Sequence, residues 1–328
     1  MAGIDINAVA EAARKVHDQI ERVMVGKRSV AELLLVAILC DGHVLIEDVP
    51  GIGKTMLARC MSRSLGCTFR RVQFTPDLLP SDITGTHVFD QKTGDFVFRQ
   101  GPVFTQVLLA DEINRATPRT QSALLEAMDE KQVTADGESM ALPKPFLVLA
   151  TQNPIELEGT FPLPEAQLDR FLLRVRMGYP TEEEDAVILD RFMQDNPIEE
   201  LASVLSAEDL VSLQAACRQV TVEADVREYM SKLTQASRNH PEIELGASPR
   251  AMLGLLHASQ ALAAIRGRSY VIPDDVKELV PAVFEHRISL QAQSNLRGDS
   301  VAAVLKEIVD SVAAPVEQQP AATAASGD

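Results

Sequence analysis

The feature that most constrains this chain is the stretch at residues 43–57, where an apolar run meets a glycine-containing loop and then a helix-forming segment. Residues 44–46 are all apolar and predict a short buried strand, and the residues from Lys54 onward predict a helix. Gly51 and Gly53 lie between them, and they let backbone N–H groups approach an anion that a Cβ would obstruct. Strand, loop and helix in this order are typical of a phosphate-binding loop.

This loop predicts which residues contact a nucleotide. They are the consecutive residues Val49, Pro50, Gly51, Ile52, Gly53, Lys54, Thr55 and Met56. Lys54 is expected to reach the β- and γ-phosphates of ATP, and the Thr55 hydroxyl is expected to complete the shell of Mg²⁺. The usual pattern has a glycine five residues before Gly53, where this chain has Asp48. An ordinary turn followed by a lysine is the alternative interpretation, but the flanking strand and helix favour the phosphate loop.

Another predicted strand delivers two carboxylates. Residues 107–110 are apolar, and Asp111 and Glu112 follow them directly. A continuous apolar run predicts a buried parallel strand, and open α/β sheets bind ligands at the carboxyl ends of such strands. We therefore expect Asp111 to hold Mg²⁺ through water and Glu112 to activate the water that attacks the γ-phosphate.

Two further polar side chains lie at the ends of predicted strands. Asn153 closes the strand that starts at residue 146, and it is expected to polarise the attacking water or to contact the γ-phosphate. Its alternative role is an Asx-turn before Pro154. Arg170 lies where a short helix runs into a fifth strand. It either forms a salt bridge at the helix end or acts as an arginine finger on the γ-phosphate of a neighbouring subunit.

The order of the predicted elements indicates an α/β domain followed by a helical domain. Helices and strands alternate up to residue 178, which predicts helices that cover a parallel sheet. Two hairpins interrupt this order, at residues 87–98 and 132–142, and the first either packs its phenylalanines or projects as a working loop. Helical segments follow one another over residues 179–312, where Arg250 is placed to reach back to a nucleotide between the domains. The Pro/Ala/Gln-rich tail at residues 313–328 is predicted to be disordered.

Composition limits the class of partner. The 328 residues include 47 Asp or Glu and 31 Lys or Arg, so the formal net charge is −16 and binding to nucleic acid is disfavoured. The longest apolar run, residues 33–40, is far too short to span a bilayer. The four cysteines have no spacing suited to zinc, and the N-terminus shows no secretory signal. We therefore expect a protein of the reducing cytoplasm.

Taken together, these stretches resemble the MoxR family of AAA+ ATPases over nearly all of the chain up to about residue 312. The resemblance is carried by residues 42–55, 111–115, 121–128, 150–154, 158–171 and 248–250. It implies an α/β fold: an AAA+ P-loop core with a parallel five-stranded sheet, flanking helices and two β-hairpin inserts, followed by a smaller all-α lid domain. It implies a core at residues 1–178, a lid at 179–312 and a tail at 313–328.

The resemblance also implies a role for each matching residue. Lys54 and Thr55 belong to Walker A, Asp111 and Glu112 to Walker B, Asn153 is sensor 1, Arg170 is the arginine finger and Arg250 is sensor 2. Arg115 and Arg119, just after Walker B, are alternatives for the finger.

Members of the family are similar to other AAA+ proteins in forming hexameric rings with ATP at the subunit interfaces. The resemblance therefore implies Mg²⁺-dependent ATP hydrolysis that drives chaperone-like remodelling or maturation of protein partners, among them proteins with a von Willebrand factor A domain. The alternative is a nucleic-acid motor of the helicase type, which needs basic residues on the hairpins. The hairpin turns at residues 92–95 and 136–138 are not net basic.

Overall fold

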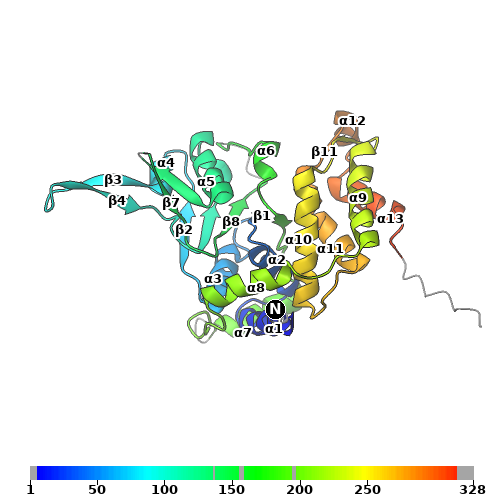
Figure 1. Cartoon of the computed structure of the whole chain (residues 1–328), viewed down its shortest axis with the longest axis horizontal. Coiled ribbons are helices and arrows are strands. Elements are labelled where there is room, and N and C mark those ends of the chain that lie inside the picture. The colour runs from blue at the N-terminus through cyan, green and yellow to red at the C-terminus, as the bar shows by residue number, and fades with distance from the viewer. Residues whose placement is uncertain (1–5, 136, 155–158, 194–196, 316–328) are drawn as a thin grey trace, which may run out of the picture.

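The computed structural model describes residues 6–135, 137–154, 159–193 and 197–315, and within these residues the core is a five-stranded parallel sheet (Figure 1). Its strand order is β2-β5-β8-β1-β9. The strands are β1 (Val44–Glu47), β2 (Phe69–Gln73), β5 (Val107–Asp111), β8 (Leu147–Gln152) and β9 (Leu173–Val175). The prediction of a parallel five-stranded core is confirmed.

Helices bury both faces of this sheet, which explains why its central strands are continuous apolar runs rather than alternating ones. In β5, Val107 and Leu109 join one apolar cluster, whereas Leu108 and Ala110 join the other. The first cluster also contains side chains of α1 (Ile6–Glu21), α2 (Arg28–Leu39) and α3 (Lys54–Ser64). The second contains side chains of α5 (Pro118–Glu130).

Two antiparallel hairpins are inserted into the core, as the sequence predicts. The first pairs β3 (Gly85–Asp90) with β4 (Asp95–Gln100), after the short helix α4 (Pro80–Thr84), and it extends well away from the body of the molecule (Figure 1). The second pairs β6 (Gln132–Ala135) with β7 (Glu138–Ala141). Asp136 in its turn lies outside the described residues.

The region after residue 178 is mainly helical. Its helices are α7 (Glu182–Phe192), α8 (Ala207–Cys217), α9 (Ala224–Asn239), α10 (Pro249–Ile265), α11 (Pro273–Phe284), α12 (Ala292–Arg297) and α13 (Val301–Ser311). It also holds an antiparallel pair that the sequence did not indicate, β10 (Ile243–Leu245) with β11 (Ser289–Leu290). Within the described part of the chain, no helix is long and apolar enough to cross a bilayer. The expected tail lies outside that part from residue 316 onward.

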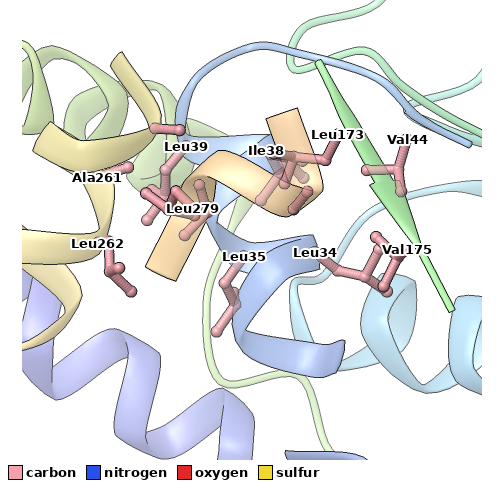
Figure 2. Close-up of a cluster of buried hydrophobic side chains, with 14 of the residues drawn as sticks. Leu34, Leu35, Ile38, Leu39, Val44, Leu173, Val175, Ala261, Leu262 and Leu279 are labelled. Carbon is pink, nitrogen blue, oxygen red and sulfur yellow. The ribbon is translucent and has the colours of Figure 1, made fainter. Parts of the chain in front are cut away.

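The helical region packs directly on the core. Leu34 and Ile38 of α2 lie in one buried cluster with Leu173 of β9, Leu262 of α10 and Leu279 of α11 (Figure 2). One apolar cluster therefore runs from the sheet through α2 into the helical region without a break. We retain residues 178 and 179 as the proposed domain boundary, since the chain leaves the sheet after β9.

The helix starts show which local signals the fold uses. Thr181, Ser206 and Ser248 each cap a helix by accepting a hydrogen bond from a backbone N–H group, as their sequences indicate. The start of α2 has no such cap: the helix begins at Arg28 with Lys27 at the N-cap position, and Ser29 lies inside it. The Lys27 side chain makes no capping bond and is engaged elsewhere.

His43 fastens the amino end of β1 to its neighbours. Its Nδ1 accepts a hydrogen bond from the Val148 backbone N–H at 3.0 Å, so Nε2 carries the proton and donates to the Met128 carbonyl at 3.1 Å. Met128 is near the end of α5, where helix carbonyls lack an intrahelical partner. Burial lowers the pKa of His43 to about 4, and the bond to Met128 opposes this shift.

We expect this histidine to make the fold sensitive to acid. The unfolded chain binds a proton at His43 with a pKa near 6.5, whereas the folded chain does so only near pH 4, so the stabilisation is complete above pH 6.5 and is lost as the pH falls. His43 alone accounts for about 2 kcal/mol of unfolding free energy lost between pH 7 and pH 5. Urea unfolding at both pH values should show a smaller loss in His43→Gln than in the wild type. The exposed His257 provides a control, and an equal loss in His43→Gln and His257→Gln would contradict the assignment.

Candidate nucleotide-binding site

The loop between β1 and α3 has the backbone geometry of an anion cradle. Gly51 and Gly53 have φ angles of 85° and 90°, in the left-handed region that side chains with a Cβ rarely adopt. A Cβ added to Gly51 would meet nothing within 4 Å, so the space beside the loop is open. Because α3 begins at Lys54, the free N–H groups of its first turn adjoin the same loop.

Asp48, at the position of the usual first glycine, fastens the loop to the chain that leaves β9. Its Oδ2 accepts hydrogen bonds from the backbone N–H groups of Met177 and Gly178, both at 2.7 Å. Lys27 Nζ donates to the carbonyl groups of the same two residues at 2.9 and 3.2 Å. The loop is thus tied to the junction between the sheet and the helical region.

Lys54 faces the acidic side of the site. Its Nζ donates to the Asp48 carbonyl at 2.6 Å. Partial burial lowers the pKa of Lys54, while the charges of Asp48, Asp111 and Glu112 oppose that shift. The loop lysine and the two carboxylates of β5 are therefore close enough to interact electrostatically.

The Asp111 carboxylate is oriented by both strands that flank β5. Thr151 of β8 donates its Oγ1 hydrogen to Oδ1 of Asp111 at 2.6 Å. Arg71 of β2 donates from Nη2 and Nε to Oδ2 at 2.6 and 3.0 Å. Asp111 thus has a fixed direction at the carboxyl edge of the sheet.

Glu112 is held by a separate set of contacts. Its φ of 56° lies in the left-handed region, which is uncommon for a residue with a Cβ and is often retained at functional sites. Gln73 Nε2 donates to Glu112 Oε2 at 2.6 Å, and Arg115 Nε lies 3.1 Å from the same oxygen. Thr151 accepts the Glu112 backbone N–H at 2.8 Å, so one threonine orients both acidic residues.

Two neighbouring cavities share the walls Pro50, Gly51 and Gly53. The first has a volume of about 260 Å³, and its polar lining includes Lys54, Thr55, Asp111, Glu112 and Asn153. The second has a volume of about 530 Å³, and its apolar lining includes Val23, Ile52, Met56, Tyr179, Ile188 and Phe192. A polar cavity beside an apolar one suits a ligand with a charged end and a flat organic end.

This donor set fits a nucleotide with a divalent cation. The Thr55 hydroxyl and the Asp111 carboxylate are oxygen ligands, which Mg²⁺ prefers, and both line the polar cavity. The glycine cradle and the start of α3 offer N–H groups to phosphate oxygens. The apolar lining of the second cavity suits the flat ring of a base. Of the predicted loop residues, Ile52 and Met56 line this apolar cavity, and Val49 donates its N–H to Asp48 Oδ1 at 2.9 Å.

The predicted arginines lie elsewhere. Arg170 Nε is 3.1 Å from Asp129 Oδ2, and Arg250 Nη2 donates to Asp129 Oδ1 at 2.9 Å. Neither arginine is among the residues that line the two cavities. Of the alternatives for the finger, Arg115 pairs with Glu112 and Arg119 is exposed on α5.

Asp129 and its two arginines lie at the amino edge of the sheet, opposite the phosphate loop. His43, directly before β1, contacts Met128, the neighbour of Asp129, and its carbonyl accepts the N–H of Leu172. The phosphate loop starts at the other end of β1, and a four-residue strand spans roughly 13 Å. The structure therefore brings together Lys54, Thr55, Asp111, Glu112 and Asn153, and it separates Arg170 and Arg250 from them.

Several residues of the site were not predicted from the sequence. Arg71 and Gln73 are two residues apart in β2, so their side chains lie on the same face of the sheet. Gln73 is the register partner of Asp111. Their signal was a polar pattern in a strand beside the acidic one. Thr151 occupied a recognisable motif, but its contact with Asp111 depends on β8 pairing with β5.

Family models match both regions of the chain. Residues 43–173 match the ATPase family associated with various cellular activities (AAA), and residues 235–308 match the AAA lid domain. The phosphate loop, the acidic strand end and these matches define the protein as a P-loop ATPase of the AAA+ class.

Whole-chain relatives narrow the class. Chaperone MoxR1 of Mycobacterium tuberculosis is 42% identical over 90% of this chain and 81% of its own length, and the uncharacterized protein YeaC of Bacillus subtilis is 49% identical over 93% and 95%. A crystal structure of an ATPase candidate from Cytophaga hutchinsonii superimposes with a TM-score of 0.89 at 36% identity, covering 95% of this chain and 97% of that one. The chain belongs to the MoxR family of AAA+ ATPases.

We expect Asp48 to stabilise the fold through the junction it holds. Asp48→Ala leaves the N–H groups of Met177 and Gly178 without their acceptor, so the free energy of unfolding should fall by about 1–3 kcal/mol. Asp48→Asn keeps an acceptor oxygen and should lose less. Denaturant unfolding of the three proteins measures the difference, and an Asp48→Ala protein as stable as the wild type would show that these bonds contribute nothing net.

Proposed function

We propose that the protein hydrolyses ATP with Mg²⁺ and uses the energy to remodel or mature protein partners. The observation that carries this proposal is the polar cavity in which Lys54, Asp111 and Glu112 meet beside the glycine cradle. The apolar cavity on the other side of Pro50, Gly51 and Gly53 supports a nucleotide, with the base against Ile52 and Tyr179. Membership of the AAA+ ATPases supports the same reaction.

In the proposed reaction, water attacks the γ-phosphorus of ATP, an oxygen–phosphorus bond forms, and the bond to the β–γ bridging oxygen breaks to release ADP. Glu112 orients the water and takes up its proton, with Asn153 as a second polar contact. Lys54 and the N–H groups of the loop offset the charge on the phosphate oxygens. Thr55 and Asp111 would hold Mg²⁺, which supplies positive charge against the β- and γ-phosphates.

We further propose that the site is completed by a neighbouring subunit in a ring, which we take to be a hexamer. Arg170 and Arg250 lie at the amino edge of the sheet, so they would serve the nucleotide of the next subunit rather than their own. The sequence led us to expect that Arg250 reaches the nucleotide between the domains of its own chain; we now propose that it reaches the nucleotide of the next subunit instead. An arginine finger supplied in trans accelerates phosphoryl transfer by about 10³–10⁵-fold.

The first hairpin supports a protein client. Val88, Phe89, Phe96 and Val97 are exposed there, and the rings of Phe89 and Phe96 stack edge to face at 5.4 Å. An exposed apolar group of this kind marks an interaction site. Binding of nucleic acid by the alternative helicase-type motor needs basic residues as well as aromatic ones, and the net charge of −16 disfavours it.

The partner is proposed from the family alone, as a protein with a von Willebrand factor A domain. A cytoplasmic location is proposed with it, since Cys40, Cys60, Cys67 and Cys217 are free thiols.

Two substitutions separate binding from hydrolysis at this site. Lys54→Ala should lose nucleotide binding, because the β- and γ-phosphates lose their charged partner. Glu112→Gln should bind ATP but turn it over at least about 10²-fold more slowly, because the amide accepts no proton. Calorimetric titration with ATP and phosphate release measure the two effects. Full turnover in Lys54→Ala would overturn the site, and full turnover in Glu112→Gln would point to another base. The Glu112→Gln protein with ATP is also the form for capturing clients.

Mixing of variants tests the ring. Arg170→Ala should bind ATP and lose turnover, since it lacks the finger but keeps its own cavity. Lys54→Ala keeps its finger but has no nucleotide. A mixture of the two should regain phosphate release that neither variant shows alone, because some interfaces then combine a working loop with a working finger. No recovery in mixed rings, verified by mass spectrometry, would contradict the trans arrangement.

A further inference from the structure

Asp129 is the meeting point of the two arginines. It lies near the end of α5, its side chain is about one-quarter exposed, and each of its carboxylate oxygens contacts a different guanidinium group. Arg170 comes from the turn after α6 (Glu165–Leu168), whereas Arg250 comes from the first turn of α10. One carboxylate therefore joins side chains that are 80 residues apart in sequence and belong to the two proposed domains.

The end of α5 that carries Asp129 is anchored on both sides. His43 binds the Met128 carbonyl at 3.1 Å, and Lys131, directly after the helix, forms an ion pair with Asp41. The end of α5 is thus fixed on both sides of Asp129 to the chain that leads into β1. A side chain on a rigid element controls the position of its partners more closely than one on a free loop.

The carboxylate of Asp129 places negative charge between the two arginines. Arg170, Arg250 and the buried Arg287 form a positive group with Asp129 and Asp169. Arg287 pairs with Asp169 at 2.8 Å, and Arg250 is near enough for its charge to contribute to the lowered pKa of Arg287, after the larger effect of burial. Like charges at this separation repel. Without Asp129, we therefore expect Arg170 and Arg250 to move apart.

We propose that Asp129 is the positioning residue that holds Arg170 and Arg250 as one unit, directed at the nucleotide of the neighbouring subunit. This rests on the proposed function, because it assigns the two arginines to an interface. Asp129 touches no nucleotide itself and acts through the arginines. It also connects the core to the lid, because Arg170 belongs to the core and Arg250 belongs to α10.

The first test needs no activity. Phenylglyoxal labels accessible arginines, and mass spectrometry maps the labelled sites in the nucleotide-free protein. In Asp129→Ala, labelling of Arg170 and Arg250 should increase, and Asp129→Asn, which keeps an acceptor but loses the charge, should lie between Asp129→Ala and the wild type. Glu130→Gln, an exposed neighbour on the same helix, is the matched control and should label as the wild type. Alanine is a strong helix former at a partly exposed position, so folding of the variant is expected.

The second test uses turnover. Asp129→Ala should bind a fluorescent ATP analogue as the wild type does, while kcat falls by about 10²-fold, the cost of a misplaced catalytic group. In a protein that already carries Arg170→Ala and Arg250→Ala, the same substitution should change nothing further. Mixing Asp129→Ala with Lys54→Ala should restore turnover, because Lys54→Ala supplies intact arginines. Mixing Asp129→Ala with Arg170→Ala should not restore it, because neither of these two variants has a working pair of arginines.

The outcomes separate this proposal from the function on which it rests. Unchanged arginine labelling and unchanged kcat in Asp129→Ala, in a protein whose Lys54→Ala form is inactive, would overturn the role of Asp129 and leave the ATPase assignment intact. Recovery in the mixture of Asp129→Ala with Arg170→Ala would also overturn it. Absence of ATP binding and turnover in the wild type would overturn the function itself, and the role of Asp129 towards nucleotide would fall with it.

Discussion

The direction of the parallel strands is the constraint on which the rest of this structure depends. Because all five strands of the described core run the same way, one edge of the sheet collects every strand end and the other collects every strand start. The phosphate loop and the acidic pair follow strand ends, whereas Asp129, Arg170 and Arg250 lie beside strand starts. The two halves of the proposed reaction are thus separated by the length of the strands, and in the proposed ring a neighbouring molecule would bring them together.

A second theme is how the helical region is joined to the sheet. The apolar cluster through α2 holds the helical region against the sheet, but apolar contacts are not directional. Buried hydrogen bonds fix the orientation of the two parts. Arg287 donates to the carbonyls of Val283 and Phe171, both at 2.6 Å, and His286 binds Phe171 as well. Asp48 accepts hydrogen bonds from the N–H groups of Met177 and Gly178, and Lys27 donates to the carbonyls of the same two residues. The segment that bears Arg170 is therefore fixed to the helical region, and the segment that leaves β9 is fixed to the phosphate loop.

Much of this arrangement was predictable because the signals are local. The loop at Gly51 and Gly53, the apolar strand before Asp111, the five-stranded core and the two hairpins all follow from patterns within a few residues. The pair β10 and β11 was missed because strands of two or three residues have no periodicity. The contacts of Arg71, Gln73 and Asp129 depend on strand order and on helix packing, which no local pattern contains. The contacts of Lys27 with the Met177 and Gly178 carbonyls join residues about 150 positions apart, and no local pattern indicates them either.

The separation of the loop and the arginines across the sheet has a consequence for how the rate of ATP hydrolysis depends on protein concentration. On the proposed arrangement a solitary molecule is catalytically silent, so the rate per molecule rises with the abundance of the protein instead of staying constant. Consumption of ATP then begins only where enough copies gather to close upon one another. On the same arrangement, newly made or diluted chains hydrolyse no ATP, and assembly is the step that starts hydrolysis.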